Sequence, residues 1–95
     1  MSEDNNMKDL MKIDLKITSR DIATWTGKRH KHILEDIKKE IAELGEIGRP
    51  IFRETFLKDS YGRLQPAFEM TEDGVMQLAL KYDAISRYKC IQDLS

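Results

Sequence analysis

The sequence predicts an α+β fold: a winged helix-turn-helix-like domain with a short N-terminal strand, a β-hairpin wing and four helices. A short and a longer helical pattern meet at a glycine, which is the outline of a helix-turn-helix. Two strand patterns around a turn sequence follow directly, and two further helical patterns complete the chain. Ninety-five residues suffice for one domain, so we assign residues 1–10 to a flexible N-terminal arm and residues 11–95 to a single domain.

The domain is expected to begin with a strand and a short helix. Residues 11–17 alternate apolar and charged side chains, and this period of two is typical of a half-buried strand. Thr18 is a favourable N-cap, and Asp21 three positions later completes an acidic variant of the capping box. Gly27 supplies a C-terminal stop, so this helix is expected to be only about eight residues long.

A longer helix is expected from about residue 29 to Leu44, ended by Gly45. Residues 45–50 contain two glycines and a proline, and we expect them to form a linker. The apolar positions of the helix fall on one stripe, as in a helix that packs on a core: Ile33, Leu34, Ile37, Ile41 and Leu44.

A β-hairpin is expected next. Residues 52–58 and 63–70 flank the sequence Asp-Ser-Tyr-Gly at 59–62, which has the first and last residues that a type I turn favours. Pro66 cannot donate a ladder hydrogen bond, so we expect its strand to lie at a sheet edge there.

Two helices close the chain. Thr71 is expected to cap the first, whose core positions are Val75, Leu78, Ala79 and Tyr82. The last helix, residues 84–94, carries Ile85, Tyr88 and Ile91 three residues apart. They form a ridge that either folds back on the preceding helix or pairs with a second copy of the chain.

The distribution of charge is more informative than the net charge of −1. Residues 20–32 carry an excess of three positive charges, and residues 34–46 an excess of three negative charges. The basic residues surround the start of the second helix, where cations oppose the helix dipole by typically 0.3–1 kcal/mol each. A basic helix N-terminus suits an anion and is where a recognition helix meets DNA. The alternative interpretation is a solvated, lysine-rich face.

Catalytic and metal-binding patterns are not recognisable. On a helical wheel His30 falls on the apolar stripe, whereas His32 and Lys28 fall opposite it. We therefore expect Lys28 to lie off the core, His30 to be a structural residue, and neither histidine to bind a metal. Cys90 is the single cysteine and is expected to be buried. The sequence has no Gly-rich phosphate loop, Ser-His-Asp order or long apolar run, so we expect no enzyme, no cofactor, no signal peptide and no membrane span.

Four segments resemble a known family, the phage regulatory protein Rha family, whose characteristic unit is the pRha domain. They are Ile-Thr-Ser-Arg-Asp-Ile-Ala at 17–23, Thr-Gly-Lys-Arg-His at 26–30, Ile-Leu-Glu-Asp-Ile at 33–37, and Gly-Arg-Leu-Gln-Pro-Ala-Phe-Glu-Met-Thr-Glu-Asp-Gly at 62–74. The resemblance covers about residues 17–82. It implies a regulator of phage or host genes, encoded by a phage or prophage and acting in the cytoplasm of a bacterial host.

We therefore expect a non-enzymatic transcriptional regulator that binds double-stranded DNA, as a homodimer built partly on the ridge of the last helix. The alternative is a small protein-interaction module whose basic face binds a host or phage protein. Helix residues and hairpin residues contribute to the expected DNA-binding surface: Arg20, Lys28, Arg29, Lys31, His32, Lys58, Tyr61 and Arg63.

Overall fold

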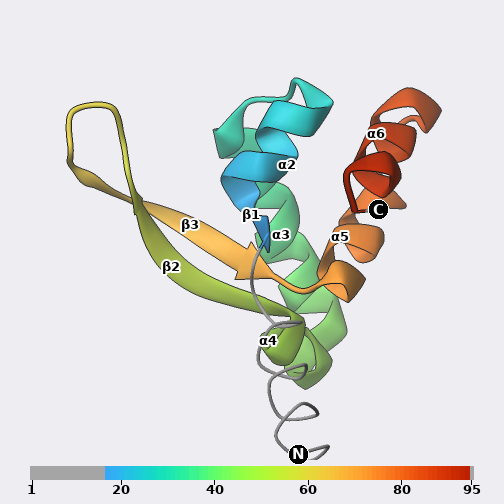
Figure 1. The fold of residues 1–95 in the computed structure, drawn as a ribbon. Helices are drawn as coiled ribbons and strands as arrows, with labels where there is room; N and C mark the ends of the chain where they lie inside the picture. The colour runs from blue at the N-terminus through green and yellow to red at the C-terminus, as the bar shows by residue number, and fades with distance from the viewer. Residues whose placement is uncertain (1–16, 95) are drawn as a thin grey trace, which may run out of the picture.

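The computed structural model describes residues 17–94 and confirms an α+β fold (Figure 1). The expected arm (1–10) and most of the expected first strand (11–16) lie outside the described residues. The elements, in chain order, are β1 (Ile17–Thr18), α2 (Ser19–Thr26), α3 (His30–Leu44), the 3₁₀ turn η1 (Gly45–Ile47), α4 (Gly48–Ile51), β2 (Phe52–Lys58), β3 (Leu64–Met70), α5 (Glu72–Ala79) and α6 (Ala84–Leu94).

Helix α2 begins and ends where the sequence indicates. The Thr18 hydroxyl accepts a hydrogen bond from the backbone N–H of Asp21, and the Asp21 carboxylate accepts one from the Thr18 N–H. This reciprocal capping box satisfies two donors that the helix itself cannot pair. Gly27 follows with φ of 73°, a left-handed conformation that favours glycine, and its N–H bonds to the Ala23 carbonyl.

The expectation of a linker at residues 45–50 is wrong. Helix α3 ends at Gly45 as expected, but the chain continues directly through η1 into the short helix α4. Gly48 is buried against α3, and a Cβ there would lie 3.3 Å from the Cα of Ile41, so the small residue permits close packing. Pro50 falls in the first turn of α4, where a missing N–H costs no helical hydrogen bond.

The sheet has the order β1–β3–β2 and is antiparallel. Strands β2 and β3 form the expected hairpin, which projects away from the helices (Figure 1). β1 pairs only with Glu69 and Met70, so within residues 17–94 the rest of β3 has no strand beside it on that side. Pro66 lies in this stretch, in agreement with the expected edge position.

The core lies between α2, α3, α5, α6 and the base of the hairpin. The predicted core positions of α5 and the following turn are all buried, including Tyr82 beyond the end of the helix. Glu40 is an unexpected member, since it is buried on α3 and its carboxylate lies 2.9 Å from the Lys81 ammonium. This ion pair ties α3 to the turn between α5 and α6.

The ridge on α6 does not fold back on α5. Ile85 and Tyr88 are 70% and 60% exposed, whereas Ser86 and Cys90 face the core. Residues 86 and 90 are four positions apart and therefore share one side of the helix. Small side chains on that side let α6 approach the core closely. The burial of Cys90 confirms the expectation for the single cysteine, and it raises the pKa of the thiol.

Candidate nucleic-acid interface

The N-terminus of α3 lacks the side-chain caps that begin α2 and α5. Arg29 occupies the N-cap position, and its side chain makes no capping hydrogen bond. The first turn contains no acidic residue. The first backbone N–H groups of a helix have no intrahelical partner, and they carry the positive end of the dipole. The turn before α3 therefore presents donors and cations together, which is an arrangement suited to phosphate.

Most of the basic residues singled out in the sequence are exposed around this turn. The exposed residues are Arg20, Arg29, Lys31 and His32.

Lys28 differs from the expectation. It was expected to lie off the core, but it is half-buried, and its ammonium lies 5.2 Å from the centre of the Tyr82 ring. A helical wheel misplaces this residue because α3 starts at His30, two positions later. In the turn itself, the Lys28 N–H donates to the Thr26 hydroxyl. Lys28 thus joins the turn to the core through a cation–π contact.

A buried polar bridge fixes the start of α3. The hydroxyl of Ser19, fully buried on α2, lies 2.8 Å from Nε2 of His30 and accepts a hydrogen bond from the backbone N–H of Phe68 at 3.0 Å. The bridge joins α2, α3 and β3 at one point. Burial, followed by the charge of Arg20, lowers the pKa of His30, so the imidazole is neutral near pH 7.

His30 is therefore structural, as its place on the apolar stripe indicates. The partner, Ser19, was not identified from the sequence. A Ser–His pair eleven positions apart has no local signal, and only the crossing of the two helices brings it together.

The hairpin tip carries the other expected site residues. The Asp59 carboxylate accepts hydrogen bonds from the N–H groups of Tyr61 and Arg63, and Gly62 adopts φ of 83°. These bonds hold the turn in shape and lower the pKa of the Asp59 carboxyl. Tyr61 is 82% exposed, with the Arg63 guanidinium 5.4 Å from its ring centre. Lys58 is exposed at the end of β2.

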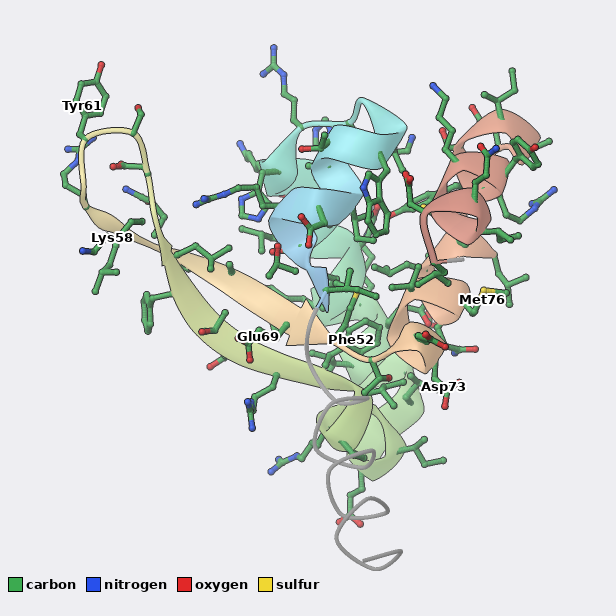
Figure 2. All side chains as sticks on the ribbon, viewed as in Figure 1. Phe52, Lys58, Tyr61, Glu69, Asp73 and Met76 are labelled. Carbon is green, nitrogen blue, oxygen red and sulfur yellow. The ribbon has the colours of Figure 1, made fainter. Side chains whose placement is uncertain are left out.

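The two basic regions lie at the same end of the molecule. In the view of Figure 1 the α2–α3 turn and the hairpin tip both lie at the top, with the hairpin leaning outward. Figure 2 shows Tyr61 pointing away from the body of the protein at that end, with Lys58 a little below it on the hairpin. The structure therefore places the expected helix and hairpin residues at one end, in two groups.

Acidic residues further along α3 do not occupy this end. Asp36 is half-buried and lies close enough to Tyr82 to contribute, after burial, to the raised pKa of that phenol. The Asp36 carboxylate therefore lies on the side of α3 that faces the turn between α5 and α6. Glu35 is exposed one turn into the helix and limits the basic surface to the first turn of α3.

Residues 17–94 contain no group of three or more His, Cys, Asp or Glu side chains placed to hold a metal ion. No helix among them is long and apolar enough to cross a membrane.

These features define a small α+β domain with a β-hairpin and with two helices joined by a basic turn, an arrangement compatible with a winged helix. The chain belongs to the phage regulatory protein Rha family, which it matches over residues 17–93. This match confirms the resemblance seen in the sequence motifs.

The chain is also similar to an uncharacterized protein of Haemophilus influenzae strain Rd. The two are 39% identical over 83 residues, which cover 81% of this chain and 48% of the relative. The chain therefore spans about half the length of that relative. No solved structure matches the chain.

Proposed function

We propose that this phage regulatory protein is a non-enzymatic transcriptional regulator that binds double-stranded DNA in the cytoplasm of a bacterial host. The α3 N-terminus would meet the duplex with Arg29, Lys31 and His32, and Arg20 would contact the backbone from α2. The hairpin would act as a wing through Lys58, Tyr61 and Arg63. Lys28 would support this surface from the Tyr82 ring and supply further positive potential.

One observation carries the proposal. Helix α3 begins with cations and no side-chain cap. The His32 N–H bonds to the Arg29 carbonyl, which leaves the N–H groups of His30 and Lys31 for an external anion, whereas stability alone favours a polar cap and acids there. Residues 20–32 carry an excess of three positive charges in a protein whose net charge is −1, so the basic character of this segment is local.

The test is binding to a fluorescent duplex of random sequence at several salt concentrations. Replacing Lys28, Arg29 and Lys31 together with Ala should weaken binding, and each lost phosphate contact should reduce the slope of log K against log salt by about 0.9. A matched control removes the same number of charges elsewhere, with Ala at Lys39, Arg49 and Arg53, all of which are exposed. The control should bind like the unchanged protein.

Equal affinity and slope in the folded triple variant would contradict the assignment of these residues. Absence of salt-dependent DNA binding in the unchanged protein would instead favour the alternative function. In that case the same basic face binds an acidic host or phage protein, and a partner that loses affinity for the triple variant but not for the control would identify it.

The wing is tested separately by Lys58→Glu together with Arg63→Glu. Both residues are exposed, so the melting temperature should be nearly unchanged. DNA binding should weaken, because two phosphate-attracting charges become repulsive. Unchanged DNA affinity would remove the hairpin from the proposed interface.

We also propose that the protein binds DNA as a homodimer through the exposed face of α6. This face includes Ile85 and Tyr88, which are 70% and 60% exposed, while Ser86 and Cys90 are buried on the other side of the helix. A dimer would double the number of phosphate contacts available to a small module. Tyr88→Asp should yield a monomer with weaker DNA binding in sedimentation at tens of micromolar protein. An 11-kDa species for the unchanged protein would refute the dimer.

A further inference from the structure

A groove runs between α3 and the hairpin, away from the α3 N-terminus. One cavity of about 480 Å³ is lined by Ile41 of α3, Arg49 of α4 and residues at the base of the hairpin. A second of about 160 Å³ continues toward the hairpin arm, where Leu34 and Lys38 of α3 line it. Glu54 and Phe68 line both cavities, so the two form one groove.

The floor of the groove is apolar, and its outer end is an exposed apolar surface. Phe52 and Phe68 are buried beneath it. Phe56 and Leu64 on the hairpin arm are 62% and 61% exposed. Phe56 pairs directly with Pro66 across the strands, so apolar side chains continue along one face of the hairpin. A protein with 35% charged residues thus leaves a row of apolar groups beside an open groove.

The strand that borders this groove has an open backbone edge. Asp59 N–H donates to Arg63 on one side of the hairpin, and Thr71 N–H donates to Ile51 at its base. Because hydrogen-bonded pairs alternate in an antiparallel ladder, these bonds direct the backbone groups of Glu54, Phe56 and Lys58 away from β3. Within residues 17–94 these backbone N–H and C=O groups make no hydrogen bond. They can therefore pair with an added strand.

The charges at the rim of the groove indicate which side chains an added strand would carry. Lys38 and Arg49 are exposed and line the groove, against the single carboxylate of Glu54. Arg53 is already paired with Glu69 at 3.2 Å. An added segment with acidic side chains would be attracted to this rim. A second copy of β2 would bring two sets of cations together and would be repelled.

We propose that the outer edge of β2 and the adjoining groove bind an extended peptide segment of a partner protein. Every second residue of the segment faces the groove, and these groove-facing residues are apolar and acidic. The segment adds a strand to β2 through main-chain hydrogen bonds, and its apolar side chains enter the groove toward Ile41 and Phe68. Its carboxylates face Arg49 and Lys38. The site meets the proposed DNA surface only at Lys58, and its groove lies at the base of the hairpin, so a regulator could hold DNA at one end and a partner protein along the hairpin.

The test is selection from a phage-displayed library of random ten-residue peptides, followed by NMR titration of the ¹⁵N-labelled protein with the synthesised consensus peptide. The selected sequences should carry apolar and acidic residues at every second position, which is the set that faces the groove, and no preference at the positions between them. The peptide should shift the amide signals of Glu54, Phe56 and Lys58. The same peptide N-methylated at alternate residues, on the edge that faces β2, should bind at least about tenfold more weakly because it cannot complete the ladder.

Two protein variants locate the site. Phe56→Asp and Arg49→Glu change exposed residues and should each weaken peptide binding by about fivefold or more, with unchanged circular dichroism. Lys89→Glu on α6 is the control and should bind normally.

The proposal is overturned by any of four results. The selection yields no consensus, or one without acidic residues. The N-methylated peptide binds equally well. The shifts fall on the first turn of α3 or on α6. Alternatively, the amides of Glu54 and Phe56, which are not among the proposed DNA-binding residues, shift on dilution of the protein alone, which means that a second copy occupies the edge, or shift on addition of random duplex DNA.

Discussion

Helices α3 and α5 begin in opposite ways. The Thr71 hydroxyl caps α5 by accepting a hydrogen bond from the Gly74 N–H, and Glu72 and Asp73 follow in the first turn. Helix α3 begins with Arg29, has no side-chain cap and carries no acid in its first turn. A Thr cap is worth about 1 kcal/mol, and each acid in the first turn about 0.3–1 kcal/mol. The start of α3 forgoes both contributions.

The difference indicates which helix end serves folding and which serves binding. The φ and ψ angles of Arg29, −69° and 141°, are those of an ordinary N-cap, so the backbone would accept a capping side chain. The uncapped start of α3 is therefore a property of its side chains alone. A variant that gives α3 the kind of first residues that α5 has should therefore change the free energy of unfolding and the DNA affinity in opposite directions.

The largest effect is expected for Arg29→Asp, which gives α3 the kind of start that α5 has. The carboxylate can accept from the first-turn N–H groups, so the free energy of unfolding should rise by about 0.5–2 kcal/mol. DNA affinity should fall by about tenfold or more, and the salt slope by about 0.9, because a phosphate contact is replaced by repulsion. Urea unfolding and fluorescence anisotropy measure the two quantities.

The control for this variant is Lys39→Asp, which makes the same change of charge at an exposed position of α3 away from its first turn. It should leave both stability and DNA affinity nearly unchanged. If Arg29→Asp stabilised the protein while DNA bound as before, the start of α3 would not be the contact surface.

A second prediction concerns the bridge that holds α3 in place. Ser19→Ala removes the hydroxyl shared by His30 and the Phe68 N–H, and it leaves buried polar groups without a partner. The free energy of unfolding should fall by about 1–3 kcal/mol. His30→Ala should cost a similar amount, and the double variant less than the sum of the two, because both remove one bridge.

Ser60→Ala, at the exposed hairpin turn, is the matched control and should have almost no effect on stability. Additive losses for Ser19 and His30 in urea unfolding would show that the two side chains act separately.

The bridge also illustrates what the sequence could and could not predict. Both ends of α2, the stop of α3 at Gly45 and the hairpin turn depend on residues within four positions of one another, and these predictions are confirmed. The Ser19–His30 contact joins residues eleven positions apart, and it depends on how two helices cross.

The misplaced features have the same origin. Glu40 belongs to the acidic segment at residues 34–46, and nothing in the sequence marks it as buried. Its partner, Lys81, is brought beside it by the turn after α5. Lys28 is placed by the Tyr82 ring, 54 positions away, and not by a helical period. For the candidate site, the residues could be listed from charge, but their grouping at one end depends on tertiary packing.

A smaller effect is expected at the capped helix. Thr71→Ala should lower the free energy of unfolding by about 1 kcal/mol, because the Gly74 N–H loses its acceptor. DNA affinity should not change, since α5 starts at the lower end of the protein in Figure 1, far from the α2–α3 turn. Thr71→Ser retains the hydroxyl and is the matched control. A loss of DNA affinity in folded Thr71→Ala would show that the two helix starts are not functionally distinct.

The smallest effect is a dependence of stability on pH that originates at His30. Burial, and then the Arg20 charge, lower the pKa of this imidazole below its ordinary value of 6.5. The unfolded chain therefore binds a proton at a higher pH than the folded protein does. This contribution to stability is fully present above about pH 6.5, and it decreases as the pH falls toward the folded-state pKa.

Urea unfolding at pH 7.5, 6.5 and 5.5 measures this dependence. The free energy of unfolding should decrease between pH 6.5 and 5.5, and the decrease should be smaller in His30→Gln, which cannot take up a proton. The Asp59 and Asp83 carboxyls also have lowered pKa values, but their contributions are lost only as the pH falls below about 4, outside this range. An equal decrease in His30→Gln would assign the pH dependence to another group. A decrease in the unchanged protein but not in His30→Gln would mean that acid weakens the Ser19–His30 bridge at the start of α3.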